Sequence, residues 1–317
     1  MAKDRSPDAE TSLSLRAAWL HYVGGLRQAE VAKRLGVPSV KAHRLIQKAV
    51  AEGAVKVSIE GEIVACIELE EALRRRYGLD VCEVAPDLDE GGLPLRTLGR
   101  AGASFLRRLL ELGEVTTIGI SHGRTLAAMV QAMPNLSMPD RRFVSLMGGL
   151  TRSYAANPHD VMYMLAVKTG ASSYVLPVPF FANSIEDRKV LLAQRGVSEV
   201  LEIARSAPVK VVGVGSAGSS AQLVVSGLIR PGEIEEISKS GGVGEMLGHF
   251  FDREGALVDT PLTARTVTVP LEKGRGDRII AIAGGEEKVG PLQAILRSGH
   301  LSGLITDERT AQQLLAR

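Results

Sequence analysis

A short polar loop holds the residues of this 317-residue chain that are best suited to bind an anionic or hydroxylated molecule. It follows the β-rich run 116–120, precedes the apolar stretch 126–130, and reads Ser121-His122-Gly123-Arg124-Thr125. Two hydroxyls, a glycine and an arginine at the start of a helix can together hold a group of the size of a phosphate. The alternative is an ordinary strand-to-helix turn, with Thr125 as N-cap, Arg124 on the surface and His122 in solvent.

Three further turns follow β-rich runs and contain glycine. The runs 143–147, 209–212 and 279–283 are followed by Gly148-Gly149, by Gly213 to Gly218, and by Gly284-Gly285. Ligands of open parallel sheets bind beyond the carboxyl ends of the strands, where glycine lets backbone N–H groups approach them. We therefore expect the four turns to line one crevice, in which the ligand lies near Gly148, Gly149, Gly213 and Gly215.

The turn that begins at Gly213 also has the Gly-x-Gly-x-x-Gly spacing of a dinucleotide-binding loop. An acidic residue about 20 positions further on would complete that pattern. Glu233 is the nearest, but it lies in a Pro-Gly-Glu turn and not at the end of a second strand. NAD is therefore disfavoured, and no cofactor is expected. No cluster of His, Cys, Asp and Glu has metal-ligand spacing, so we expect no metal.

A second set of polar residues lies near the N-terminus, along one expected helix. It consists of Ser39, Lys41, His43, Arg44, Gln47 and Lys48. Each of these side chains can donate a hydrogen bond to a base edge or a phosphate, as a recognition helix in the major groove of DNA must do. The alternative is the solvated face of a three-helix bundle.

Three helices are expected to position that face. Apolar residues recur at helical spacing three times, and Gly24-Gly25, Gly36 and Gly53 end the three segments. The expected core consists of Leu15, Ala18, Trp19, Tyr22, Val23, Val31, Ala32, Leu35, Ala42, Leu45, Ile46, Ala49 and Val50. The spacing favours a helix-turn-helix domain over residues 1–59. In it Ser39 caps the third helix, and Lys56 of a following wing strand meets the DNA backbone.

The uneven distribution of charge supports a DNA-facing segment. The formal net charge is +2, yet residues 1–60 hold ten Lys or Arg against six Asp or Glu, and the rest of the chain is slightly acidic. The two cysteines are too few for a disulfide framework. No run approaches the roughly 18 apolar residues of a membrane span. We therefore expect a cytoplasmic protein with no membrane partner.

From residue 60 onward β-rich runs alternate with helical stretches, which predicts an α/β fold with a mostly parallel sheet. Residues 60–317 are expected to form one domain for effector binding and oligomerisation. Its first segment, 60–77, is predicted to be a linker helix with an apolar stripe that includes Cys66, Leu69 and Leu73. Cys66 is expected to be buried, and the stripe offers a surface for assembly, a coiled-coil contact between two copies being one alternative.

Several segments resemble the SorC-type, or sugar-binding, bacterial transcriptional regulators. They are the stretch from Ala17 to Ile46 and the segments 119–126, 146–150, 176–180, 213–215, 244–252, 283–288 and 304–308. The resemblance is nearest to regulators of erythritol and related polyol catabolism. It implies a sensor domain similar in fold to glucosamine-6-phosphate and ribose-5-phosphate isomerases. It also implicates Ser121 to Thr125 in ligand binding, together with Glu245, Asp252 and Lys288.

The chain departs from the family at two places. Pro38-Ser39 stands where Ser-Arg is common before the recognition helix, and Met147 stands where some members carry a basic residue. The missing cation at Met147 favours a monophosphate or an uncharged polyol over a bisphosphate as ligand. Without the resemblance, Glu245 is explained equally well as a helix cap, Asp252 as a turn residue and Lys288 as a solvated side chain.

Together these patterns predict a ligand-controlled transcriptional regulator of a carbohydrate or polyol catabolic operon, and not an enzyme. The expected partners are double-stranded operator DNA and a small sugar, polyol or sugar phosphate. One helix-turn-helix makes few base contacts, so we expect a homodimer or homotetramer that reads repeated half-sites. The alternative is a sugar-phosphate isomerase with an accessory N-terminal domain and Glu245 or His122 as its base, although an isomerase has no use for residues 1–60.

Overall fold

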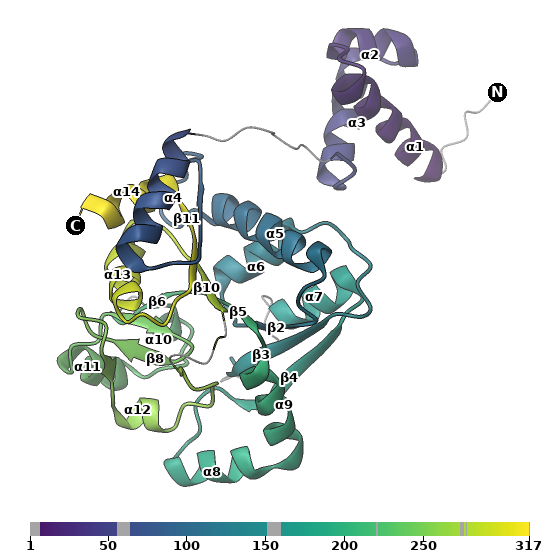
Figure 1. Cartoon of the computed structure of the whole chain (residues 1–317). Helices are drawn as coiled ribbons and strands as arrows, with labels where there is room; N and C mark the ends of the chain where they lie inside the picture. Colours follow the sequence, from purple (N-terminus) through teal and green to yellow (C-terminus); the bar gives the residue numbers. More distant parts are fainter. Residues whose placement is uncertain are drawn as a thin grey trace. The chain divides into compact units, whose positions relative to one another are not determined.

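The computed structural model describes residues 7–55, 64–150, 160–219, 221–272, 276 and 278–316. Contacts within the chain divide it into two compact units, Met1–Gly61 and Glu62–Arg317 (Figure 1). The predicted domain boundary at 59/60 and the predicted wing-strand residue Lys56 lie outside the described residues.

The first unit is helical. A helix at Pro7–Ala18 (α1) continues as one π-helical turn at Trp19–Val23 (η1), and two further helices follow at Gln28–Leu35 (α2) and Ser39–Ala51 (α3). Gly36 ends α2 in a left-handed conformation with φ 63°, which glycine adopts without strain. The three predicted helices and the tight turn before the third are thus confirmed. Pro38, and not Ser39, is the N-cap of α3.

The core of this unit differs from the prediction mainly in the first helix, although the predicted core residue Val50 of α3 is also 40% exposed. Ser14 and Ala17 are fully buried, whereas Trp19 and Val23 are 59% and 69% exposed. Ala17 packs in one cluster with Ala42, Leu45 and Ile46 of α3, and its small side chain lets the two helix backbones approach closely. Of the predicted stripe, Leu15, Trp19, Tyr22 and Val23 therefore face outward. Its fifth member, Ala18, is buried.

The second unit is built on a parallel sheet of seven strands in the order β1-β11-β10-β5-β2-β3-β4. All six strand pairs are parallel, and the strands are Val81–Ala85 (β1), Thr117–Ile120 (β2), Arg142–Gly149 (β3), Ser172–Pro179 (β4), Val209–Val212 (β5), Arg278–Ile282 (β10) and Gly303–Asp307 (β11). The four predicted β-rich runs form neighbouring strands in the middle of the sheet. From β2 the chain proceeds to one edge and from β5 to the other, so the topological switch point lies between β2 and β5.

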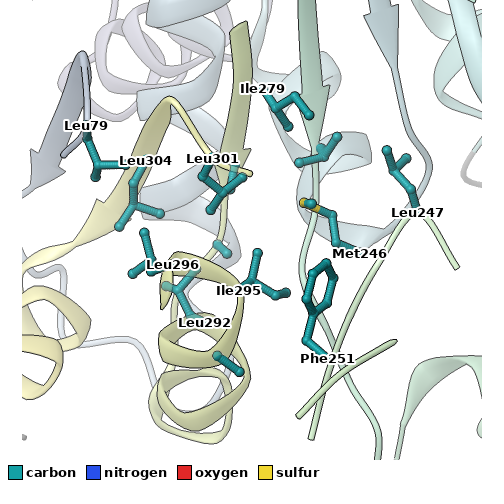
Figure 2. Packing of buried hydrophobic residues seen from close by; sticks show 14 of the residues in the cluster. Leu79, Met246, Leu247, Phe251, Ile279, Leu292, Ile295, Leu296, Leu301 and Leu304 are labelled. Atoms are coloured by element: carbon teal, nitrogen blue, oxygen red, sulfur yellow. The ribbon is translucent and has the colours of Figure 1, made fainter. Parts of the chain in front are cut away.

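Helices cover both faces of this sheet (Figure 1). One face packs against Leu95–Leu112 (α5), Arg124–Ala132 (α6) and Val161–Thr169 (α7), and the other against Val64–Tyr77 (α4), Arg195–Ser206 (α9), Val289–Arg297 (α13) and Glu308–Ala316 (α14). Consecutive apolar residues of a strand alternate between the two cores, as with Val211 and Val212. Figure 2 shows part of the second core, to which α13 contributes Leu292, Ile295 and Leu296 and the parallel strands contribute Ile279 and Leu304.

The apolar stripe of α4 packs inside its own unit. Cys66 and Leu73 are buried, and Leu69 packs against the same core, to which β1 and α14 contribute. The helix prediction is confirmed over Val64–Tyr77 and so is the burial of Cys66, but the prediction of a free stripe for assembly or a coiled coil is wrong. The edge strand β1 and the C-terminal helix α14 pack against the stripe and cover it.

A small antiparallel sheet, not predicted from the sequence, follows β5. Its strands are Gly215–Ser216 (β6), Gly244–Met246 (β7), His249–Phe251 (β8) and Leu257–Val258 (β9), and short helices at Gln222–Val225 (α10), Pro231–Lys239 (α11) and Pro261–Ala264 (α12) flank it. Leu247 and Gly248 join β7 to β8, both with positive φ, in a two-residue hairpin turn. Ile185–Ala193 (α8) and the 3-10 turn Glu286–Lys288 (η2) complete the unit. No described helix is both long enough and apolar enough to cross a membrane.

Candidate functional site

The polar face of α3 is open to solvent. Five of its side chains are exposed, those of Ser39, Lys41, His43, Arg44 and Gln47. The sixth, Lys48, is partly exposed, and its Nζ lies 3.9 Å from Glu52 Oε1. The apolar face of the same helix is buried, because Ala42, Leu45 and Ile46 pack into the core of the first unit. The core therefore fixes which way the polar face points. A hollow of about 420 Å³ lies beside it, lined in part by Lys41, Arg44 and Lys48.

A cavity of about 360 Å³ lies at the switch point of the parallel sheet, where β2 and β5 end. Nine of the sequence-predicted site residues line it: Ser121, His122, Gly123, Arg124, Thr125, Gly213, Gly215, Glu245 and Lys288. Apolar residues that the sequence did not single out complete the wall, among them Leu93, Leu150, Val214, Leu223, Leu228 and Leu247. A mostly apolar cavity with a few convergent polar groups is the usual form of a small-molecule site.

The loop after β2 enters this cavity with its glycine in an unusual conformation. Gly123 is the N-cap of α6 and has φ 135°, a backbone angle that residues other than glycine rarely adopt. The alternative in which Thr125 caps the helix is therefore wrong. Arg124 is the first residue of α6 and is exposed, as in that alternative, yet it also lines the cavity. The first backbone N–H groups of α6 have no partner within the helix and favour an acceptor or an anion nearby.

Ser121 joins the two halves of the sheet across the switch point. Its side chain is buried, its Oγ accepts a hydrogen bond from Gly213 N at 3.2 Å, and its own N–H donates to Val211 O at 3.0 Å. The hydroxyl is thus engaged in positioning the loop after β5. This contact holds the first and third glycine-bearing turns side by side.

His122 lies between this cavity and a second one of about 630 Å³, and it lines both. Its Nε2 is 3.2 Å from Ser145 Oγ, and that hydroxyl donates to Met147 O at 2.7 Å. Burial lowers the pKa of His122, and the nearby carboxylate of Asp160 opposes this shift. The alternative of a solvated histidine is therefore wrong. The signal missed in the sequence is Ser145, a single polar residue among the apolar residues of a buried strand.

Glu245 and Lys288 bring opposite charges to the cavity from separate elements. Glu245 Oε1 accepts a hydrogen bond from Gly248 N at 2.6 Å, so it stabilises the hairpin turn and caps no helix. Burial raises the pKa of Glu245, while the bond from Gly248 and the charge of Lys288 oppose the rise. Burial lowers the pKa of Lys288, the charge of Glu245 partly restores it, and that of Arg124 lowers it further.

Three predicted site residues do not line this cavity. Asp252 Oδ1 accepts hydrogen bonds from Glu254 N at 3.0 Å and Ala256 N at 2.8 Å, so Asp252 is the turn residue of the alternative interpretation. Gly148 lies so close to the backbone of Pro179 that a Cβ would be 2.6 Å from its carbonyl oxygen, which explains the glycine by packing. Gly149 lines the second cavity. The residues that flank the glycine pair, Met147 and Leu150, line the first cavity instead.

The described residues offer neither a dinucleotide loop nor a metal site. After Gly213 the chain enters β6, and the next helix, α10, spans four residues beginning only at Gln222. A pyrophosphate would need a helix that starts directly at the glycine-rich turn. Glu233 caps α11 and pairs with Arg265. Within the same ranges no three His, Cys, Asp or Glu side chains gather as metal ligands would.

Comparison with known proteins places both units in one family. Residues 61–316 match the family described as "Putative sugar-binding domain". Over 308 residues the chain is 60% identical to the erythritol catabolism regulatory protein EryD of Brucella abortus (strain 2308), with 97% of this chain and 98% of that protein covered. It is 31% identical over 315 residues to the transcriptional regulator LsrR of Enterobacter sp. (strain 638), with 97% and 94% covered.

Solved structures agree with these sequence matches. The full-length sorbitol operon regulator SorC from Klebsiella pneumoniae matches with a TM-score of 0.69 and 26% identity, covering 97% of this chain and 99% of that one. A DeoR family transcriptional regulator from Listeria monocytogenes matches with a TM-score of 0.72 and 26% identity, covering 79% and 99%. The chain therefore belongs to the SorC-type family of sugar-binding transcriptional regulators.

Proposed function

We propose that this protein is a DNA-binding regulator of a polyol catabolic operon, controlled by a four-carbon polyol or its monophosphate. One observation carries the proposal: a single chain combines an exposed, basic helix face with a separate cavity in which a few polar groups converge. The relative at 60% identity is a regulator of erythritol catabolism, which supports erythritol or a product of its metabolism as the effector. Such a regulator acts where the operators are, in the cytoplasm.

The proposed effector contacts follow from the charges in the cavity. Arg124 is close enough to Lys288 for its charge to lower the pKa of that lysine, and both side chains suit an anionic group or hydroxyl oxygens. The side chain of Met147, which also lines the cavity, brings no further cation. A monophosphate or a neutral polyol therefore fits better than a bisphosphate. Gly213 and Gly215 allow the backbone to approach the ligand.

Control of transcription requires that the effector bind two states of the protein with different affinity, because it can shift their equilibrium by no more than that difference. We propose that two or four copies of the chain assemble on repeated half-sites, since one α3 offers few base contacts. The effector then changes the probability that paired recognition helices match the operator spacing.

The test of DNA binding is the double variant Lys41→Ala/Arg44→Ala, measured by fluorescence anisotropy on the promoter region of its own operon. Both side chains are exposed and leave the core untouched. Base contacts contribute about 1–3 kcal/mol each, so affinity should fall by about 30-fold or more. Lys33→Ala/Arg34→Ala removes the same charge from exposed positions of α2 and should reduce affinity much less. Equal losses in the two variants would refute α3 as the sequence-reading helix.

We further propose that the cavity binds its ligand without converting it. An isomerase would use Glu245 or His122 as a base, but the Glu245 carboxylate accepts a hydrogen bond from its own hairpin turn. An aldose–ketose assay should show no turnover with any compound that raises the melting temperature. Measurable turnover of a bound sugar phosphate would instead favour the enzyme.

A further inference from the structure

We infer that the exposed apolar side chains of α1 and η1 form the surface through which two copies of the first unit contact each other on DNA. This surface, here called the α1 stripe, consists of Leu15, Trp19, Tyr22 and Val23. The inference rests on the proposed function, since it needs two copies at neighbouring half-sites. It names the surface that joins them, which the proposed function leaves open.

The α1 stripe is continuous and apolar. Leu15, Trp19 and Val23 are spaced by four residues, so their side chains lie on one side of the helix, and Tyr22 is their neighbour at a spacing of three from Trp19. The four side chains are between 47% and 69% exposed. Single exposed apolar residues are common, but a continuous group marks an interaction surface. Tryptophan and tyrosine are also enriched at the centres of protein interfaces.

The core of the first unit forms without the α1 stripe. Ser14, Ala17 and Ala18 are the buried residues on this part of α1. Ala17 and Leu20 pack in one cluster with residues of α2 and α3, and no member of the α1 stripe belongs to that cluster. Folding of the unit therefore leaves four large apolar side chains in contact with water, where a partner can bury them.

The charge of the first unit favours a second copy as that partner. Residues 7–55 contain seven Lys or Arg and four Asp or Glu, so two such units repel each other over most of their surfaces. The α1 stripe contains no charged residue, so two copies can approach each other there. A symmetric contact between apolar groups is complementary to itself, whereas an acidic or basic partner would find no charge in the stripe to pair with.

The area of the α1 stripe explains why DNA is needed for the contact. Large aromatic side chains bury about 150–250 Å² each, so the exposed parts of these four offer on the order of 400 Å². A stable protein interface takes about 800 Å² from each partner. The stripe alone is thus too small for a lasting dimer of first units. It is sufficient where DNA already holds two copies side by side, because the second contact is then intramolecular.

The place of the α1 stripe in the unit suits paired half-sites. Because α1 packs directly against α3, a contact between two α1 helices gives the order α3, α1, α1, α3. Packed helices lie about 8–10 Å apart, which puts the two α3 axes at most about 30 Å apart. Half-sites one turn of DNA apart are separated by about 34 Å, and those two turns apart by about twice that distance. The contact therefore fits neighbouring half-sites one turn apart.

The first arm of the test uses Trp19, the only tryptophan of the chain, as a reporter of the α1 stripe. Quenching of its fluorescence by acrylamide is measured on the full chain, free and saturated with promoter DNA. We expect less quenching on DNA in the wild type, because a second copy covers the ring. In Val23→Lys the quenching should stay as strong as in the free protein. Trp19 that is fully quenched in the wild type on DNA, or equally protected in Val23→Lys, overturns the inference.

The second arm identifies what covers the α1 stripe. Val23→Cys and Trp19→Cys are treated with a short bismaleimide on promoter DNA, and the two native cysteines are buried. At least one variant should give covalent dimers on a denaturing gel, whereas Ala29→Cys, at an exposed position of α2, should give none. If neither stripe variant gives dimers, the stripe belongs to another partner, such as the second unit of the same chain, and the inference is overturned.

The third arm is affinity for promoter DNA, measured by fluorescence anisotropy. Val23→Lys and Leu15→Lys put like charges on both sides of the contact and should bind about tenfold or more weakly, the effect of losing one strong interface residue. The added positive charge alone would instead strengthen binding to DNA. The matched control is Val167→Lys on α7, where the valine is 65% exposed, and its affinity should stay within about twofold of the wild type.

The outcomes separate the inference from the function on which it rests. If the wild type does not bind the promoter DNA, the proposed function is wrong and the inference falls with it. If the wild type binds, but Val23→Lys and Leu15→Lys bind as tightly as Val167→Lys, the inference alone is overturned. Unchanged circular dichroism and melting temperature of the free variants show that a loss of affinity is not a loss of fold.

Discussion

Substitution of Gly215 by alanine tests how closely the two sheets of the second unit fit at the cavity. The backbone of Gly215 is not left-handed, so alanine brings no conformational strain of its own. Its Cβ would lie 3.2 Å from Glu245 Cβ and 3.4 Å from Glu245 Cδ, and it would overlap Oε2. The carboxylate must then turn away, and its hydrogen bond to Gly248 N, 2.6 Å long, is lost.

The expected cost is that of one hydrogen bond to a charged group. Such bonds contribute about 1.5–3 kcal/mol, so the free energy of unfolding should fall by about this amount in Gly215→Ala. For a domain of this size that corresponds to a melting temperature lowered by about 3–12 °C. Thermal and urea unfolding followed by circular dichroism measure both quantities.

Two controls make the result decisive. In Gly213→Ala, two residues away, the nearest atom to the new Cβ would be His122 O at 3.9 Å, so this variant should be nearly as stable as the wild type. In a Glu245→Ala background the overlap with Oε2 disappears and only the 3.2 Å contact with Cβ of residue 245 remains, so Gly215→Ala should cost clearly less than it does in the wild type. The reasoning is refuted if Gly215→Ala behaves like Gly213→Ala, or if its cost is the same with and without the Glu245 carboxylate.

Three further predictions concern charge. Arg124→Ala should remove most of the thermal stabilisation by erythritol monophosphate and less of that by erythritol, and equal losses would assign Arg124 a structural role. Burial lowers the pKa of His122 and His249 in the folded protein. As the pH falls below about 6.5, the unfolded state therefore binds more protons than the folded state does. The free energy of unfolding of the wild type should then fall more steeply between pH 7 and 5 than that of His122→Gln/His249→Gln, by up to about 1.4 kcal/mol per pH unit for each ring, and parallel curves would contradict this. Burial raises the pKa of Cys82 to about 12 and also that of Cys66, so neither thiol should react with a disulfide reagent at pH 8 until the protein unfolds, and one fast-reacting thiol in the folded protein would disprove it.

The central strands were predictable because their residue types agree with their environment. Runs such as 209–212 and 279–283 are rich in valine and isoleucine, and the strands are buried on both faces. The glycine-bearing turns after them could be placed at one edge of the sheet, because carboxyl ends of parallel strands coincide. The two-residue and three-residue strands of the antiparallel sheet are too short to show any alternation, so their place in the fold could not be derived.

The first helix shows a different limit of prediction. Two overlapping apolar stripes fit the sequence at 12–23, and the larger residues Trp19 and Tyr22 favoured the wrong one. Contact with α3 selects small side chains instead, and the apolar pattern of one helix does not show which other helix will pack against it. Similarly, His122 could be placed in the site loop, but its hydrogen bond to Ser145 depends on a strand 23 residues away. The position of a residue follows from local pattern, whereas its protonation follows from long-range packing.

The pairing of β1 with β11 has a consequence for how the protein is made. The strand at one edge of the sheet, Val81–Ala85, hydrogen-bonds to the last strand of the chain, Gly303–Asp307, and Arg76 of α4 donates to Leu315 O of α14 at 2.8 Å. During translation residues 64–85 of α4 and β1 are made before residues 303–316 of β11 and α14, so they must wait for the intervening chain to be synthesised before their partners exist. A stop codon or frameshift near residue 300 therefore leaves an exposed strand edge and an apolar helix stripe, the features by which chaperones and proteases recognise incomplete chains.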